Sequence, residues 1–151
     1  MFRQVLVAYD GSAPAESALT AALDLARGQP TDLLLAVVVS DLPLDVEMSS
    51  GAMLEASREA QQAEAERILA VARARVAQAD LPCRCAVLLS GGRRTAEVIV
   101  DHAVREHAGL IVVGSHGRRG VSRALLGSDA ELVARLSPVP VLIVKTPPAA
   151  H

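Results

Sequence analysis

Aromatic side chains are nearly absent from this sequence: Phe2 and Tyr9 are the only two, and tryptophan does not occur. Proteins that bind single-stranded nucleic acid commonly stack bases on such rings, so that class is disfavoured. An excess of one charge is also lacking, because the formal net charge is only -2. A nearly neutral chain has no strong field to attract DNA, RNA or an anionic membrane surface. We therefore expect no nucleic-acid partner.

Long apolar runs and cysteines are scarce as well. The most apolar stretch, 33–39, lies between Asp32 and Asp41, and it is far shorter than the roughly 18 to 20 residues of a membrane span. The first residues lead directly into a strand-like segment without a signal-peptide pattern, which predicts a cytoplasmic protein with no membrane partner. Cys83 and Cys85 are the only cysteines. Their spacing suits neither a disulfide nor a complete zinc site, so we expect inert thiols.

The chain does contain enough apolar surface for one core. Its 151 residues are 51% hydrophobic and 21% charged, which is typical of a folded domain. We assign that domain to 1–146 and regard 147–151 as a flexible C-terminal tail. Apolar blocks rich in β-branched residues predict strands at 5–9, 33–39, 86–89, 110–113 and 139–144. Because these blocks are continuous, they predict strands covered on both faces.

The intervals between these blocks have the apolar spacing of helices, at 14–27, 52–79, 95–107 and 128–136. Ser12 is a plausible N-cap for the first of them, with Pro14 close to the first turn. Strands and helices therefore alternate along the whole chain. This order predicts an α/β fold: a single-domain, open, parallel five-stranded sheet with helices on both faces, as in Rossmann-like proteins. Such sheets bind ligands at the carboxyl ends of their strands.

The most informative segment follows the fourth predicted strand and runs from Gly114 through Gly117 to Gly127 and Ser128. Glycines let a backbone approach an anion closely, and a helix start presents N–H donors to oxygen. Arg118 and its neighbour can add positive charge. Phosphate is the ligand that this pattern favours. A plain glycine-rich loop, with Ser128 acting only as an N-cap, explains the same residues.

Other familiar motifs do not occur. The chain has neither a Gly-x-x-x-x-Gly-Lys-Ser/Thr loop nor a Gly-x-Gly-x-x-Gly turn after its first strand. Ser90-Gly91-Gly92 follows the third strand and reads as a turn at the sheet edge, of little functional weight. His102 and His107 lack partners for a metal site and read as surface or half-buried side chains. His116 and Ser128 lack an evident base and orienting group, which disfavours a Ser-His-Asp hydrolase.

The spacing Gly114-x2-Gly117-x9-Gly127-Ser128, between an apolar strand and a terminal Pro-Val-Pro-Val-Leu-Ile-Val segment, resembles the ATP-binding motif of the universal stress protein family. The opening Val-Leu-Val-Ala-Tyr-Asp-Gly-Ser, which ends at Ser12, is similar to that family's first strand and helix start. The resemblance extends over essentially the whole chain. It implies an adenine nucleotide alpha hydrolase-like fold that binds ATP.

The resemblance also implies roles for individual residues. The adenine would lie near Ala8, Asp10 and Val37, although Asp10 as a helix cap and Val37 as a core residue are equally simple readings. Ribose and phosphates would lie along Gly114, Ser115, His116 and Gly117, and the phosphate tail would meet Gly127, Ser128 and Asp129. Asp129 departs from the family pattern, which has a small or apolar residue there. A carboxylate beside phosphates is repulsive unless a cation such as Mg²⁺ intervenes.

We thus expect an ATP-binding, nucleotide-responsive cytoplasmic homodimer involved in stress response. The segment from Val139 to Val144 would pair with its twin, since an unpaired apolar edge is a liability; an interior strand covered by helices is the alternative. Two rival functions remain: an interaction or chaperone-like dimer whose glycine loop stays empty, and a slow ATP hydrolase. No P-loop lysine or obvious base supports fast hydrolysis. The sequence identifies no protein partner.

Overall fold

The computed structural model describes residues 1–40, 50–117 and 125–147, and strands and helices alternate through them. Its strands are β1 (Gln4–Ala8), β2 (Asp32–Val39), β3 (Cys83–Leu89), β4 (Leu110–Gly114) and β5 (Val141–Val144). Its helices are α1 (Ala13–Ala26), α2 (Gly51–Gln78), α3 (Thr95–Arg105) and α4 (Ser128–Leu136). The predicted element order is confirmed, and most predicted boundaries agree to within one or two residues.

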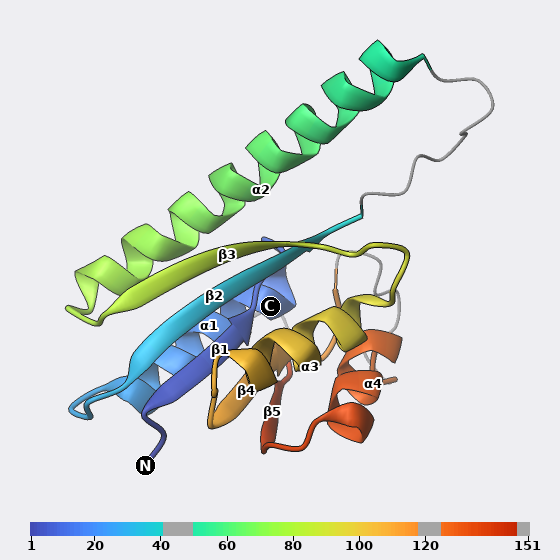
Figure 1. The fold of residues 1–151 in the computed structure, drawn as a ribbon. Helices are drawn as coiled ribbons and strands as arrows, with labels where there is room; N and C mark the ends of the chain where they lie inside the picture. Colours follow the sequence, from blue (N-terminus) through green and yellow to red (C-terminus); the bar gives the residue numbers. More distant parts are fainter. Residues whose placement is uncertain (41–49, 118–124, 148–151) are drawn as a thin grey trace.

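All strand pairs are parallel, and the five strands follow the order β3-β2-β1-β4-β5 (Figure 1). The chain moves outward from β1 to β3, returns across the sheet through α3, and continues outward on the other side. The order therefore reverses between β1 and β4. In an open sheet of this kind, the crevice above such a switch point is where ligands bind. The predicted fold class, a single-domain Rossmann-like α/β sheet, is confirmed.

Alternating side chains of the central strands supply two separate cores. Val5 and Val7 of β1 pack on one face with α1 and α2, whereas Leu6 packs on the other face with α3 and α4. Leu33 and Leu34 of β2 divide in the same way. A strand with apolar residues at every position needs such cover on both faces. The continuous apolar blocks were therefore a correct guide for the three inner strands.

The prediction that all five strands are covered on both faces holds only in part for the two edge strands, which pack against both cores but keep side chains partly exposed. Every residue of β5 is only half buried, and Arg84, Cys85 and Leu89 of β3 are exposed. An edge strand has a sheet neighbour on one side only, so solvent reaches its side chains. The terminal strand also begins at Val141 and not at Val139, because Pro140 has no N–H to donate to the ladder.

Helix α2 is much longer than the sheet that it covers. Its 28 residues extend about 42 Å at 1.5 Å per residue. The buried residues of α2 lie between Ala65 and Val76, in its carboxyl-terminal half. The amino-terminal half extends past the end of the sheet (Figure 1). None of the described helices is long and apolar enough to cross a membrane.

Candidate functional site

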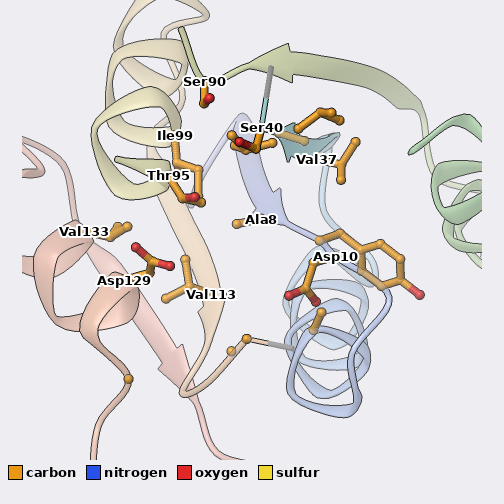
Figure 2. Close-up of a pocket in the computed structure, with 18 of the residues that line it drawn as sticks. Ala8, Asp10, Val37, Ser40, Ser90, Thr95, Ile99, Val113, Asp129 and Val133 are labelled. Carbon is orange, nitrogen blue, oxygen red and sulfur yellow. The ribbon is translucent and has the colours of Figure 1, made fainter. Parts of the chain in front are cut away.

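A pocket of about 1060 Å³ lies at the carboxyl ends of the strands. The residues that line it come from the ends of β1, β2 and β4, from the segments that follow β1, β3 and β4, from the first turns of α1, α3 and α4, and from one face of α2. Figure 2 shows Ala8 and Asp10 on one side of the pocket and Val113, Asp129 and Val133 on the other. The pocket therefore sits above the switch point, where the fold predicts a ligand.

The segment after β1 closes on itself through polar contacts. The Ser12 N–H donates to Asp10 Oδ1 at 2.9 Å, and Gly11 between them has a φ of 78°. The Ser12 hydroxyl then accepts the Ala15 N–H at 3.3 Å, so Ser12 caps α1 as predicted. The reading of Asp10 as the cap of α1 was wrong, since its carboxylate holds the amide of the cap residue. Asp10 lines the pocket from this turn.

The segment after β4 approaches α1 closely. A Cβ at Gly114 would lie 2.6 Å from the backbone carbon of Pro14, so this glycine is required by packing between β4 and the first turn of α1. Ser115 is buried; its N–H donates to the Val144 carbonyl at 2.8 Å, and its hydroxyl lies 3.1 Å from His116 Nδ1. Ser115 does not line the pocket, whereas His116 does. Ser115 thus positions the loop.

The start of α4 is held by the same loop. The Gly127 N–H donates to the Ser115 carbonyl at 2.8 Å, and a Cβ at Gly127 would lie 2.8 Å from that oxygen. Gly127 is the N-cap of α4, and Ser128 is its first helical residue. The alternative reading of Ser128 as only an N-cap is wrong, because the cap position is Gly127 and the helix begins at Ser128 as predicted. A glycine has no side chain with which to bind the first amides.

Gly117 joins two loops of the site, whereas Arg118 falls beyond the described part of the same loop. Gly117 lies within the pocket wall, and a Cβ there would lie 3.2 Å from Asp10 Oδ2. The loops after β1 and β4 therefore meet at this glycine. Arg118, which was expected to add positive charge, lies outside the described residues. The predicted site residues that do line the pocket are Ala8, Asp10, Val37, Gly114, His116, Gly117, Gly127, Ser128 and Asp129.

Charged side chains in the described wall of the pocket are mostly acidic. Asp10 and Asp129 contribute carboxylates from opposite sides (Figure 2). Glu64 of α2 also lines the pocket and forms an ion pair with Arg67. Arg93 lies in the wall as well, but its guanidinium is 2.6 Å from a carboxylate oxygen of Asp101. An anion bound here would lie close to carboxylates.

A series of side-chain hydrogen bonds holds in place the part of the pocket wall that follows β1. The Tyr9 hydroxyl donates to Glu16 of α1, and Arg75 of α2 donates to the other oxygen of the same carboxylate. Arg75 also donates to Thr20 Oγ1 at 2.9 Å. Burial of the phenol, followed by its bond to Glu16, raises the pKa of Tyr9 above its usual value. Tyr9 therefore stays neutral and joins β1, α1 and α2 beside the pocket.

Sequence reasoning missed two further parts of the wall. Ser90, Gly92 and Thr95 line the pocket, although the turn after β3 was considered unimportant (Figure 2). The turn does lie at the sheet edge, but it also follows the carboxyl end of a strand, and that rule could have identified it. The second part is one face of α2, with Ser57 and Gln61. Nothing in its spacing distinguishes this face from an ordinary solvated helix.

The remaining candidates lie away from the pocket. His102 is half buried and His107 is exposed, as expected. Burial lowers the pKa of His102, which favours its neutral form. Within the part of the chain that the structure describes, no three metal-ligating side chains lie together. The described chemistry of the pocket is that of a binding site: apolar walls, a glycine-rich loop and a helix start.

An open parallel sheet whose strand order reverses beneath such a pocket defines a doubly wound α/β protein. Comparison with known families makes this more specific. Residues 1–145 match the model of the universal stress protein family. The chain therefore belongs to the universal stress protein family, as its sequence motifs indicated.

Individual relatives agree with this assignment. A universal stress protein of Thermus aquaticus is 37% identical over 146 residues, which cover 96% of this chain and 100% of the relative. The structure of universal stress protein UspA from Lactobacillus plantarum, 23% identical, shares the fold with a TM-score of 0.76 and covers 93% of this chain and 96% of its own. A universal stress protein solved in complex with cAMP is 26% identical, with a TM-score of 0.71 and coverage of 97% and 98%.

Proposed function

We propose that this protein is a nucleotide-responsive cytoplasmic module of the stress response that binds an adenine nucleotide, ATP in particular, in the pocket above β1 and β4. The observation that carries the proposal is the start of α4. Gly127 begins this helix without a capping side chain, and Ser128, Asp129 and Ala130 line the pocket. The first amides of a helix have no intrahelical acceptor, and they favour a negative charge. Phosphate oxygens are suitable acceptors.

The rest of the pocket suits the other parts of a nucleotide. Ala8 and Val37 offer an apolar wall for a flat base, and Asp10 beside them offers carboxylate oxygens to base or ribose N–H and O–H groups. Gly114 to Gly117 lies between this wall and α4, where ribose and the first phosphate would pass. The volume of about 1060 Å³ is ample for a nucleotide. The relative solved with cAMP also carries an adenine nucleotide.

The test begins with the protein as purified from its host. We expect denaturation to release adenine nucleotide that mass spectrometry detects, and calorimetry on the stripped protein to show ATP binding. Gly117→Val should abolish binding because its methyl groups would fill the space next to Asp10, while the far-UV circular dichroism stays unchanged. Gly51→Val is the matched control, since a Cβ at Gly51 meets nothing within 4 Å.

Two outcomes would contradict the assignment. Equal ATP affinity in Gly117→Val and the parent protein would show that the phosphates do not bind at this loop. An empty pocket that also takes up no added nucleotide would favour the rival function, an interaction or chaperone-like dimer. Slow ATP hydrolysis is compatible with binding, but rapid turnover that falls in Ser128→Ala would indicate a dedicated hydrolase. The described pocket offers no lysine to neutralise the transferred phosphate.

The proposal includes a homodimer formed through β5. This strand is at the sheet edge, and the side chains of Val141, Leu142, Ile143 and Val144 are all half buried. An apolar edge strand has unpaired backbone groups that can hydrogen-bond to another strand. A second copy of the chain can supply an identical edge across a two-fold axis. We expect light scattering in dilute solution to give the mass of a dimer. A monomer at the same concentration would contradict this part of the proposal.

A further inference from the structure

The two cysteines lie together on the edge strand β3, at the end of the sheet opposite the pocket. Cys83 and Cys85 pair in register with Leu33 and Leu35, whose side chains belong to the core under α1 and α2. Cys83 packs against that core, and Cys85 lies two residues further along the same face of the strand. Both cysteines are free; Cys83 is half buried and Cys85 is exposed. Two free thiols on one face of the strand thus lie at an accessible edge.

The strand geometry prevents these thiols from forming a disulfide in place. Residues two apart on a strand are separated by about 6.7 Å, and their Cβ atoms point the same way. A disulfide needs Cβ atoms about 3.8 Å apart. A third atom that binds both sulfurs allows them to stay further apart than a disulfide bond does. Sulfurs bound at about 2.3 Å to one centre lie roughly 3.3 to 3.8 Å apart, a separation that two thiol side chains on the same face of a strand can reach by rotation about their own bonds.

The number of sulfur donors limits which metal or metalloid the two thiols can bind. Zinc takes four ligands, but the described residues place no third metal-ligating side chain beside the two thiols. Trivalent arsenic that carries one organic group needs two thiolates to complete its three bonds. Soft centres of this kind prefer sulfur donors.

We propose that Cys83 and Cys85 form a two-thiol site for monosubstituted trivalent arsenicals. With phenylarsine oxide, both S–H bonds and the arsenic–oxygen bonds break, two arsenic–sulfur bonds form, and the oxygen leaves with the two thiol protons as water. Arsenic stays trivalent, so no oxidant is needed. Burial and the neighbouring thiol raise the pKa of Cys83 to about 12. The Cys83 thiol is therefore protonated until a dithiol-seeking reagent bridges the two sulfurs.

The experiment uses the folded full chain and one equivalent of phenylarsine oxide in excess glutathione, followed by intact mass spectrometry. We expect one phenylarsenic group per chain, loss of both titratable thiols, and release by a small dithiol such as dimercaptopropanol. Cys85→Ser and Cys83→Ser should each lower the retained adduct at least tenfold, because glutathione competes with a single thiol but not with a chelating pair.

The two variants also keep the test decisive. Cys85 is exposed, so Cys85→Ser is expected to fold even if the half-buried Cys83→Ser does not. Parent protein that loses the arsenical to glutathione as easily as Cys85→Ser would overturn the proposal. An intramolecular disulfide formed by mild peroxide without loss of the native circular dichroism would contradict the geometry. Nucleotide binding should be unchanged by the adduct, since the pocket lies at the other end of the sheet.

Discussion

Helices α1 and α4 both begin at the edge of the sheet that holds the pocket, yet their first turns differ. At α1 the protein supplies its own acceptors: Ser12 accepts the Ala15 N–H, and Asp10 accepts the Ser12 N–H. At α4 the N-cap is Gly127, whose only contribution is its backbone. A capped helix start has less to offer an external anion than an uncapped one. The difference supports the proposal that the start of α4, and not the start of α1, binds the ligand.

The two helix starts also differ in what their nearby glycines do. Gly114 makes room for Pro14 in the first turn of α1, so it serves the packing of β4 against that helix. Gly127 makes room for the Ser115 carbonyl and so sets the direction of α4. Both glycines belong to the motif that predicts a phosphate site. Their demonstrated role is to bring backbone segments together, which is how such a site is shaped.

Among changes at the two helix starts, the largest effect is expected from Gly127→Ala, which should distort the start of α4. Its Cβ would lie 2.8 Å from the Ser115 carbonyl and 3.2 Å from His116 Cα, and backbone atoms must move to relieve this. We expect a loss of about 1 to 3 kcal/mol in the free energy of unfolding, typical of overpacking, and at least a tenfold loss of ATP affinity. Urea denaturation and calorimetry measure the two. Unchanged affinity would show that the geometry of α4 is unimportant for binding.

An intermediate effect is expected from Asp129→Val, because Asp129 occupies the first turn of α4 and lines the pocket. Repulsion between unit charges about 6 Å apart is about 3 kcal/mol at an effective dielectric constant of about 20, and it falls below 1 kcal/mol in water. Asp129 is exposed, so we expect ATP to bind about three- to tenfold tighter, with a smaller gain for AMP and less dependence on Mg²⁺.

The control for Asp129 is Glu131→Val, which removes a charge from the same first turn without altering a pocket residue. Calorimetric titrations of ATP and AMP, each with and without Mg²⁺, compare the two variants. Weaker ATP binding in Asp129→Val would mean that the carboxylate holds the cation and assists binding. An equal gain in both variants would assign the effect to the overall charge of the helix end.

The smallest effect is expected from Ser12→Ala. Loss of an N-cap costs about 1 kcal/mol of stability, and ATP affinity should stay the same, since this cap serves α1 alone. Ser50→Ala is the matched control: Ser50 accepts the Met53 N–H at the same 3.3 Å, but at the protruding end of α2. Fraying there should leave global unfolding by urea almost unchanged. A fall in ATP affinity in Ser12→Ala would weaken the distinction between the two helix starts.

Local signals in the sequence were sufficient for the order of the elements. Continuous apolar runs such as 33–39 identified the strands, and Ser12 followed by Pro14 identified the start of α1, because period and capping depend on neighbours a few residues away. The motif from Gly114 to Ser128 located the candidate site for the same reason. These features would be recognised in any chain that carried them.

Tertiary structure alone decided what those elements meet. Which strands lie at the edges, and so which apolar runs stay half exposed, depends on the β3-β2-β1-β4-β5 order. The roles of Ser57 and Thr95 in the pocket wall, and the contact of Gly114 with Pro14, join residues far apart along the chain. No local pattern encodes such contacts, because they arise only when parallel strands bring their carboxyl ends to one edge of the sheet.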